Sequence, residues 1–234
     1  MGKVLTPFQD RVLLLLFDLG LGSRDYFFTG GSALAEFYLQ HRESDDLDLF
    51  TRVDRNLKAD FEDLKPIIAS EGLEIMEQSA EEQFVRFFLH NPAPGESDLK
   101  VELARDAKAQ MAPSKVVGKV IVDSFEDISV NKVCAILGRE PPERKDFVDL
   151  YFILRESSFS LDYLVARARE KEAAFDNEDG ILAFATNLLR FKELAMKSFI
   201  DSGRIIKTVT LSDLEEVLLP RAEAIIQRLR PKTT

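Results

Sequence analysis

Hydrophobic and polar positions follow two different periods along the chain, and each period predicts a type of element. The stretch from Phe8 to Leu19 is rich in apolar residues and follows Thr6-Pro7-Phe8-Gln9, a capping-box start with proline at the first helical position. The apolar run Tyr26-Phe27-Phe28 suits a short buried strand, which breaks at Gly30-Gly31. Residues from Ser32 to Leu39 return to a helical pattern. The chain therefore begins with a helix, a strand and a second helix.

A clear alternation with period two follows His41-Arg42. Asp46 and Asp48 alternate with Leu47 and Leu49. Because alternate side chains of a strand share a face, this pattern places the two aspartates side by side and turns the leucines toward the core. We therefore expect a strand with two adjacent carboxylates on its polar face.

The following segment predicts one helix and three strands. Asp54 is expected to cap a helix that ends at Gly72 and carries one apolar stripe, formed by Leu57, Phe61, Leu64 and Ile68. The expected strands are Leu73 to Met76, Phe84 to Leu89 and Leu99 to Leu103, and a turn rich in proline joins the last two. The predicted sheet is mixed and partly antiparallel. Residues 104–122 read as an irregular, partly basic loop.

The second half of the chain has helical periodicity throughout. One helix is expected to start at Asp127-Ile128-Ser129, and Lys132 and Arg139 share a face of it. A second follows Pro141-Pro142 and carries Asp146. Three further helical stretches are expected to form a bundle: Leu161 to Ala174, Gly180 to Met196 and Leu211 to Leu229.

Composition narrows the class of protein. The 234 residues, 45% of them hydrophobic, suffice for one sizeable core or two modest lobes. Val12 to Phe17 is too short an apolar run to cross a bilayer, so a cytoplasmic protein is expected. The single Cys134, with apolar neighbours, is expected to be a buried thiol, and two histidines with one cysteine argue against zinc. A net charge of −10 argues against a broad nucleic-acid-binding face but permits a local basic patch.

Two stretches carry candidate chemistry. A Gly30-Gly31-Ser32 turn that feeds a helix would direct backbone N–H groups and the positive end of the helix dipole at one point, which suits a phosphate group. Asp46 and Asp48 repel each other when both are ionised, and carboxylate oxygens in such a pair suit Mg²⁺ that also binds phosphates.

These residues resemble the signature of the AbiEii/AbiGii-type branch of the nucleotidyltransferase superfamily. The matching N-terminal string is Gly30-Gly31-Ser32, a helix, and then His41-Arg42-x-Ser44-x-Asp46-Leu47-Asp48-Leu49-Phe50. Two later strings resemble the C-terminal motifs of that branch: Lys132-x-x-Ala135-x-x-x-Arg139 and Lys145-Asp146-x-x-Asp149-Leu150-Tyr151. The matching pieces span about half of the chain in the expected order.

The resemblance implies roles for residues that spacing leaves open. Glu102 lies on a strand face with Asp98 and Lys100, which by itself reads as a solvated face; the resemblance makes it the third metal-site carboxylate, where the family more commonly has aspartate. Lys132 and Arg139 would by spacing form a salt-bridged surface stripe; the resemblance makes them ligands of a triphosphate. Asp146 matches an acidic catalytic position, against the alternative of a salt bridge to Arg139.

The resemblance also implies the fold and the reaction. The expected class is α+β: a nucleotidyltransferase-type mixed β-sheet with flanking helices in residues 1–125, and a helical C-terminal lobe in residues 126–234, with the active site between the lobes. The implied reaction is Mg²⁺-dependent transfer of a nucleoside monophosphate from an NTP to an acceptor hydroxyl. A toxin role in a toxin–antitoxin or phage-defence system would follow, with tRNA as a candidate acceptor and a cognate antitoxin as partner.

Two other functional classes stay open from the sequence. A catalytically inactive nucleotide- or protein-binding module could have the same fold, although the presence of both aspartates with Lys132 argues against it. A hydrolase with Ser32 as nucleophile and His41 as base would lack the flanking glycine of the G-x-S-x-G turn.

Overall fold

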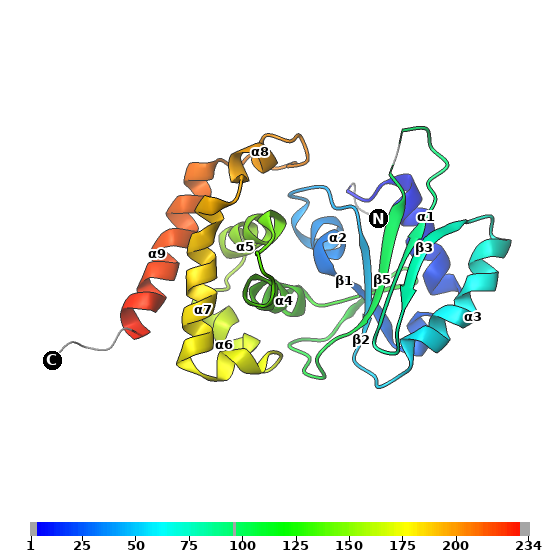
Figure 1. Ribbon diagram of the computed structural model, residues 1–234, viewed down its shortest axis with the longest axis horizontal. Helices are drawn as coiled ribbons and strands as arrows, with labels where there is room; N and C mark the ends of the chain where they lie inside the picture. Colours follow the sequence, from blue (N-terminus) through cyan, green and yellow to red (C-terminus); the bar gives the residue numbers. More distant parts are fainter. Residues whose placement is uncertain (1–3, 96, 230–234) are drawn as a thin grey trace. The chain divides into compact units, whose positions relative to one another are not determined.

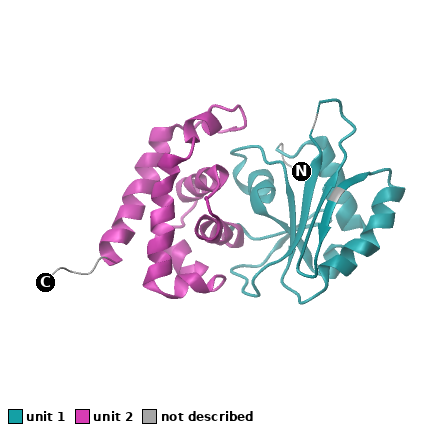
Figure 2. Cartoon of the chain, viewed as in Figure 1, with its two compact units in different colours: residues 1–125 teal, residues 126–234 magenta. Residues whose placement is uncertain are grey.

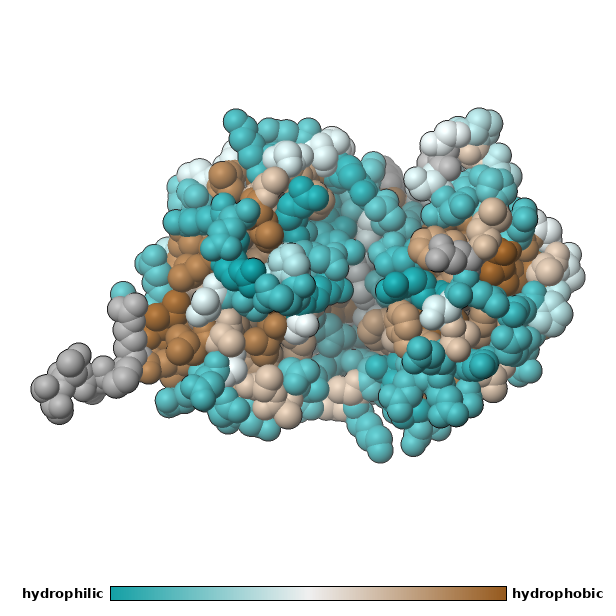
Figure 3. Space-filling view, in the orientation of Figure 1, coloured by the Kyte–Doolittle hydropathy of each residue, from teal (hydrophilic) through white to brown (hydrophobic). Residues whose placement is uncertain are grey.

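The chain folds into two compact units in the computed structural model, which describes residues 4–95 and 97–229. One unit comprises Met1–Phe125 and the other Glu126–Thr234 (Figure 2). Figure 3 shows hydrophilic residues over much of the visible surface of each unit, in keeping with the 31% of residues that are charged.

The first elements of the N-terminal unit agree with the sequence pattern. Thr6 accepts a hydrogen bond from the backbone of Gln9, whose side chain accepts one from the backbone of Thr6, so the expected capping box starts α1. The elements up to the first acidic strand are α1 (Pro7–Asp18), a 3₁₀ turn (Gly22–Arg24), β1 (Tyr26–Thr29), α2 (Gly30–Leu34), a π-helical turn (Ala35–Leu39) and β2 (Leu47–Thr51).

The rest of the unit completes the sheet. Its elements are α3 (Leu57–Ser70), β3 (Ile75–Ala80), β4 (Phe84–Leu89), β5 (Leu99–Arg105), β6 (Lys115–Val117) and β7 (Val120–Val122). Within the described residues the strands form one mixed sheet in the order β3-β4-β5-β2-β1-β7-β6. Strand β2 pairs parallel with β5, and β1 pairs parallel with β7, while the other neighbours are antiparallel.

The register of the sheet separates an apolar face from a polar one. Leu49 of β2 lies opposite Leu103 of β5, and Phe87 of β4 lies opposite Val101; these buried side chains share a face. Phe61 of α3 stacks on Phe87 with 4.8 Å between ring centroids, so α3 covers this apolar face (Figure 1). The side chains at alternate positions, the acidic residues of β2 and β5 among them, therefore lie on the opposite face.

The C-terminal unit is helical. Its elements are α4 (Phe125–Gly138), α5 (Arg144–Glu156), α6 (Leu161–Ala168), α7 (Glu178–Leu189), α8 (Met196–Ile200), α9 (Leu211–Leu229) and 3₁₀ turns at Ala173–Asp176 and Arg190–Glu193. Phe147 of α5 packs against Phe191, and Phe175 against Phe184 of α7; all four rings are fully buried. The packing of aromatic rings thus explains the apolar stripes of this half.

Several expected elements need correction. The cap of α3 is Asn56, whose side chain accepts from Ala59 N, and not Asp54. The third strand starts at Ile75, two residues later than expected, and the expected loop at 104–122 contains β6 and β7. These strands have three residues each, too few to show a period. Cys134 is half-buried instead of fully buried.

None of the helices in the described ranges is long and apolar enough to cross a bilayer. The cytoplasmic location expected from the sequence stays a prediction.

Candidate active site

Gly30 and Asp48 are in direct contact where β1 turns into α2. Gly30 has φ +74°, and a Cβ placed on it would lie 1.9 Å from Oδ2 of Asp48. Both the backbone conformation and the lack of space therefore require glycine here. The group that lies closest to this glycine is the carboxylate of Asp48.

The next two residues hold the acidic segment in place. A Cβ on Gly31 would lie 2.6 Å from Nη2 of Arg42, which is 2% exposed, so the missing side chain makes room for the guanidinium. The hydroxyl of Ser32 is buried and donates a short hydrogen bond to the carbonyl oxygen of Asp46. Gly31 and Ser32 thus position the residues that precede β2, and their expected contact with phosphate stays a prediction.

The strand register brings two of the expected carboxylates together. Asp48 of β2 lies opposite Glu102 of β5 in the parallel pair, so their side chains are neighbours on the polar face. Asp46 lies one residue before β2 begins, not within a strand as expected. Asp46 is two positions from Asp48 in the sequence, and its carboxylate forms an ion pair with Lys100 of β5.

Lys100 connects the acidic residues. Its Nζ lies 2.8 Å from Oδ2 of Asp46 and 3.3 Å from Oε1 of Glu102. Nε of Arg86 on β4 lies 2.7 Å from the same Oε1. The side chains of Asp46, Glu102 and Lys100 are 18%, 14% and 24% exposed, so their charges interact more strongly than they would in bulk water.

Neighbouring charges shift the pKa values of Glu102 and Lys100. Burial alone would raise the pKa of Glu102, but the positive charges of Lys100 and Arg86 outweigh it and lower the pKa. Burial alone would lower the pKa of Lys100, but the hydrogen bond to Asp46 and the charges of Asp46, Glu102 and Asp48 raise it. Glu102 and Lys100 therefore both favour their charged forms.

The donors fit a divalent cation in chemical type, although the geometry is not that of a formed metal site. In residues 4–95 and 97–229, no three His, Cys, Asp or Glu side chains come together in a way that could hold a metal ion. Carboxylate oxygens are the ligands that Mg²⁺ prefers, and Asp48 and Glu102 are in register. The ammonium of Lys100 supplies positive charge between Asp46 and Glu102.

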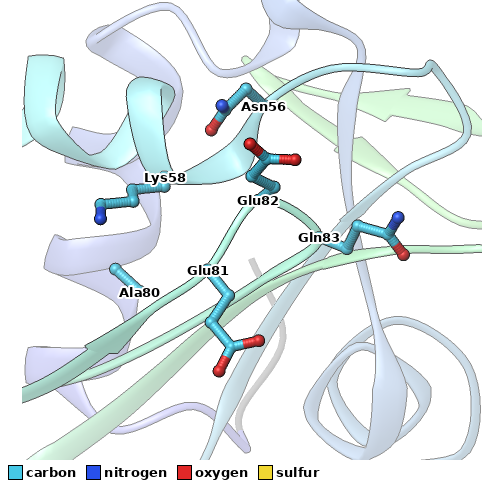
Figure 4. Close-up of a pocket in the computed structure, with 6 residues that line it drawn as sticks. All are labelled: Asn56, Lys58, Ala80, Glu81, Glu82 and Gln83. Atoms are coloured by element: carbon cyan, nitrogen blue, oxygen red, sulfur yellow. The ribbon is translucent and has the colours of Figure 1, made fainter.

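Two pockets of the N-terminal unit differ in their relation to this cluster. One, of about 350 Å³, is lined by residues that directly precede Asp46 and Lys100, among them Glu43, Ser44, Asp45, Asp98 and Leu99. The other, of about 570 Å³, lies at the start of α3 and the turn between β3 and β4, and Figure 4 shows the six residues that line it: Asn56, Lys58, Ala80, Glu81, Glu82 and Gln83. None of the expected site residues lines either pocket; the first is lined by sequence neighbours of Asp46 and Lys100.

The expected site residues of the C-terminal unit form a salt-bridged cluster. Nζ of Lys132 lies 2.9 Å from Asp146 and 2.8 Å from Asp149, and Nη1 of Arg139 also binds Asp146. Both aspartates are fully buried, and the side chain of Lys132 is 8% exposed. Lys132 is therefore buried and does not lie on the exposed surface stripe that its spacing alone suggested. Arg139 and Asp146 form the salt bridge that was the alternative to a catalytic role for Asp146.

Several participants were not among the expected site residues. Lys100 is two positions from Glu102 on one strand, and Asp149 is three positions from Asp146 on one helix, so their spacing already placed each beside a candidate. The contact of Arg42 with Gly31 depends on the path of the chain between α2 and β2, and no local pattern indicates it.

Comparison with known proteins agrees with this fold. A candidate nucleotidyltransferase from H. pylori has 18% sequence identity and a TM-score of 0.61, with 96% of this chain and 97% of that chain covered. JHP933 from Helicobacter pylori also has 18% identity, with a TM-score of 0.59 and coverages of 94% and 91%. No curated protein matches the sequence. At this identity the likeness concerns the fold.

The fold and the acidic sheet face define the class as nucleotidyltransferase-type proteins. The family model described as nucleotidyl transferase AbiEii toxin, type IV toxin–antitoxin system, matches residues 14–229. The chain belongs to this family, and it is a nucleotidyltransferase.

Proposed function

We propose that this chain transfers a nucleoside monophosphate from an NTP to an acceptor hydroxyl, and that Asp46, Asp48 and Glu102 hold Mg²⁺ for this reaction. The acceptor oxygen forms a bond to the α-phosphorus, the bond from that phosphorus to the bridging oxygen breaks, and pyrophosphate leaves. Bound Mg²⁺ would offset the negative charge of the phosphates during the in-line displacement.

One observation supports the proposal most directly. Asp48 and Glu102 face each other on adjacent parallel strands, and the ammonium of Lys100 binds both Asp46 and Glu102. A cation at this position is thus already part of the cluster. Hard oxygen donors of this kind favour Mg²⁺ over a softer metal.

The remaining residues support this arrangement in different ways. Gly30 leaves space for the carboxylate of Asp48, and Ser32 holds the carbonyl of Asp46. The lowered pKa of Glu102 suits a metal ligand better than a base, since a base works best with a pKa near the working pH. We retain Gly31 and Ser32 as phosphate-binding residues, because their N–H groups lie in the first turn of α2.

The cluster of the C-terminal unit is part of the proposal. Lys132, Arg139 and Asp146 are assigned to nucleotide binding and catalysis, as the family motifs imply. Because the two aspartates already bind Lys132, its ammonium would act from a fixed position, with its carboxylate partners orienting it.

We also propose an acceptor and a partner, on the basis of the family resemblance. We take the hydroxyl of a tRNA as the first candidate acceptor and a cognate antitoxin as the protein partner, in the cytoplasm. A protein with net charge −10 would bind RNA through a local patch.

Labelled transfer tests the proposal. The protein is incubated with Mg²⁺, each of the four α-³²P-labelled NTPs, and either total RNA or total protein, and the polymer that gains label is identified. We expect label in RNA with at least one NTP, and a loss of at least about 100-fold in Asp48→Asn, the scale at which a catalytic group contributes.

Asp98→Asn is the matched control, since Asp98 precedes the same strand as Glu102, is 38% exposed and pairs with His90. Equal labelling by Asp48→Asn and the parent would reject the assignment of Asp48. No labelling of any polymer by the parent would favour the inactive binding module.

A further inference from the structure

The acidic cluster contains a cation that belongs to the chain itself. Nζ of Lys100 lies 2.8 Å from Asp46 and 3.3 Å from Glu102, both within the range of a direct ion pair. Asp48 lies opposite Glu102 in the parallel strand pair, so its carboxylate lies on the same sheet face. Two carboxylates therefore bind this ammonium directly, and a third lies on the same face.

A second cation, Arg86, differs from Lys100 in its placement. Its guanidinium binds Glu102 alone of the three carboxylates in the contacts of the described residues, and its side chain is 46% exposed. Lys100 binds two carboxylates, Asp46 just before β2 and Glu102 within β5, and is 24% exposed. Lys100 is thus the cation that lies between the carboxylates, and Arg86 lies at their edge.

A divalent cation would need the same oxygens. Mg²⁺ binds carboxylate oxygens at about 2.0–2.1 Å and requires them in a nearly octahedral arrangement, which an ammonium within hydrogen-bond distance of the same atoms prevents by repulsion and by volume. Lysine has a flexible four-carbon stem, and the partial exposure of this side chain leaves it a way to solvent.

We propose that Lys100 is an internal counter-ion of the active site, which a divalent metal must displace before it can bind. The inference rests on the proposed metal-binding role of Asp46, Asp48 and Glu102. In the metal-free protein Lys100 relieves the repulsion among the three carboxylates. Because the metal must displace this ammonium, the affinity of the site for metal alone is low. The metal therefore binds well only together with a ligand that brings its own negative charge, such as a nucleoside triphosphate.

Metal affinity without nucleotide tests this competition. The dissociation constant of Mn²⁺, used as the probe, is measured from the electron paramagnetic resonance signal of free Mn²⁺ in the parent, in Lys100→Met and in Lys65→Met. Lys65 is the matched control because it also pairs with a carboxylate, Glu62 at 3.3 Å, and is 30% exposed. We expect Mn²⁺ to bind Lys100→Met on the order of 10-fold more tightly than the parent, a typical coupling between two binding events, and Lys65→Met like the parent.

A second measurement uses the unmodified chain and does not depend on the folding of a variant. The rate at which a small acylating reagent modifies Lys100 is followed by mass spectrometry with and without saturating Mg²⁺. Release of the ammonium from Asp46 and Glu102 should raise this rate several-fold, while the rate at Lys65 stays constant.

The outcomes separate the two proposals. Mn²⁺ binding of equal or lower affinity in Lys100→Met, together with an unchanged acylation rate, would overturn the displacement and leave the metal site standing. If Mn²⁺ binds neither the parent nor Lys100→Met, the proposed metal site fails and the inference fails with it.

Discussion

Two glycines of the N-terminal unit have the same backbone conformation and different surroundings. Gly30 and Gly72 both have φ +74°, but a Cβ on Gly72 would meet no atom within 4 Å, whereas one on Gly30 would collide with Asp48. Gly72→Ala should destabilise the fold by about 1–2 kcal/mol, the cost of the left-handed conformation for alanine. Gly30→Ala should cost at least about 1 kcal/mol more, because the carboxylate must also move. Urea unfolding at pH 7 measures both.

The double variant Gly30→Ala/Asp48→Ala separates the two causes. Removing the carboxylate should bring the cost of alanine at position 30 close to that of Gly72→Ala. A cost at position 30 no larger than at position 72 would contradict the contact between Gly30 and Asp48.

Asp60 of α3 gives a pH dependence that can be measured away from the acidic cluster. It is 6% exposed, and it accepts hydrogen bonds from Arg55 at 2.6 Å and from the hydroxyl of Tyr26 at 2.9 Å. Burial alone would raise the pKa of Asp60, but these hydrogen bonds and the nearby positive charges lower it below its usual value of 3.8. A lowered pKa in the folded state adds stability above the unfolded pKa and loses it as the pH falls through the folded pKa.

Asp60→Asn should therefore lower the free energy of unfolding by about 3 kcal/mol at pH 7. The difference from the parent should shrink as the pH falls below about 3.8, because the unfolded parent then takes up a proton on Asp60 while the folded parent still keeps the carboxylate charged. Asp63→Asn is the control, since Asp63 is 69% exposed and contacts only the edge of the cluster, 3.4 Å from Arg24. A deficit of equal size at pH 7 and pH 3.5 would contradict the assigned pKa shift.

At the scale of elements, the pair α4 and α5 depends on one buried charge. Lys132→Met leaves Asp146 and Asp149 buried without their shared ammonium, and breaking such a cluster costs about 3–5 kcal/mol. Lys145→Met should cost less than about 1 kcal/mol, because Lys145 is 33% exposed and its partner Glu143 is 44% exposed. Chemical unfolding compares the two variants. If the free energy of unfolding fell by the same small amount in both variants, the proposed role of Lys132 in stabilising the fold would be contradicted.

The sequence predicted long elements well and short ones poorly. The stripe of α3 repeats often enough to identify a helical period, and the expected strand Phe84–Leu89 has the bounds of β4. Strands β6 and β7 have three residues each. Strand β6 pairs with β7 and β7 pairs with β1, and such pairing between distant segments cannot be read from a local sequence pattern. The cap of α3 was misassigned because Asp54 and Asn56 are both good capping residues two positions apart.

The site was predictable as a set of residue types and not as a set of contacts. Period two identified Asp48, and the family motif identified Glu102, which the structure places in register with it. The interaction of Lys100 with Asp46 joins residues 54 positions apart in a parallel pair, so it depends on which strands become neighbours. The assignment of Glu102, where the family more commonly has aspartate, stays a prediction.

At the scale of the whole molecule, the chain belongs to the AbiEii family and folds into two compact units. The acidic residues belong to the unit Met1–Phe125, and the cluster around Lys132 belongs to the unit Glu126–Thr234. The proposed reaction assigns metal binding to the first and nucleotide binding to both. That the two sets of residues serve one reaction stays a prediction.

The measurement that tests this account most directly is the thermal unfolding of the parent and of Asp48→Asn in EDTA, in Mg²⁺, and in Mg²⁺ with each NTP. In EDTA the two proteins should melt within a few degrees of each other, because asparagine has nearly the same shape and one fewer charge in a cluster of three carboxylates. Mg²⁺ with the preferred NTP at 100 times its dissociation constant should stabilise the parent by about 2.7 kcal/mol, roughly 5–10 °C in Tm for a chain of this size.

Asp48→Asn should gain none of this stabilisation, and Asp98→Asn should gain all of it. A gain in Asp48→Asn equal to that of the parent, with the same NTP and the same dependence on Mg²⁺, would contradict the central claim that Asp48 holds the metal and its nucleotide.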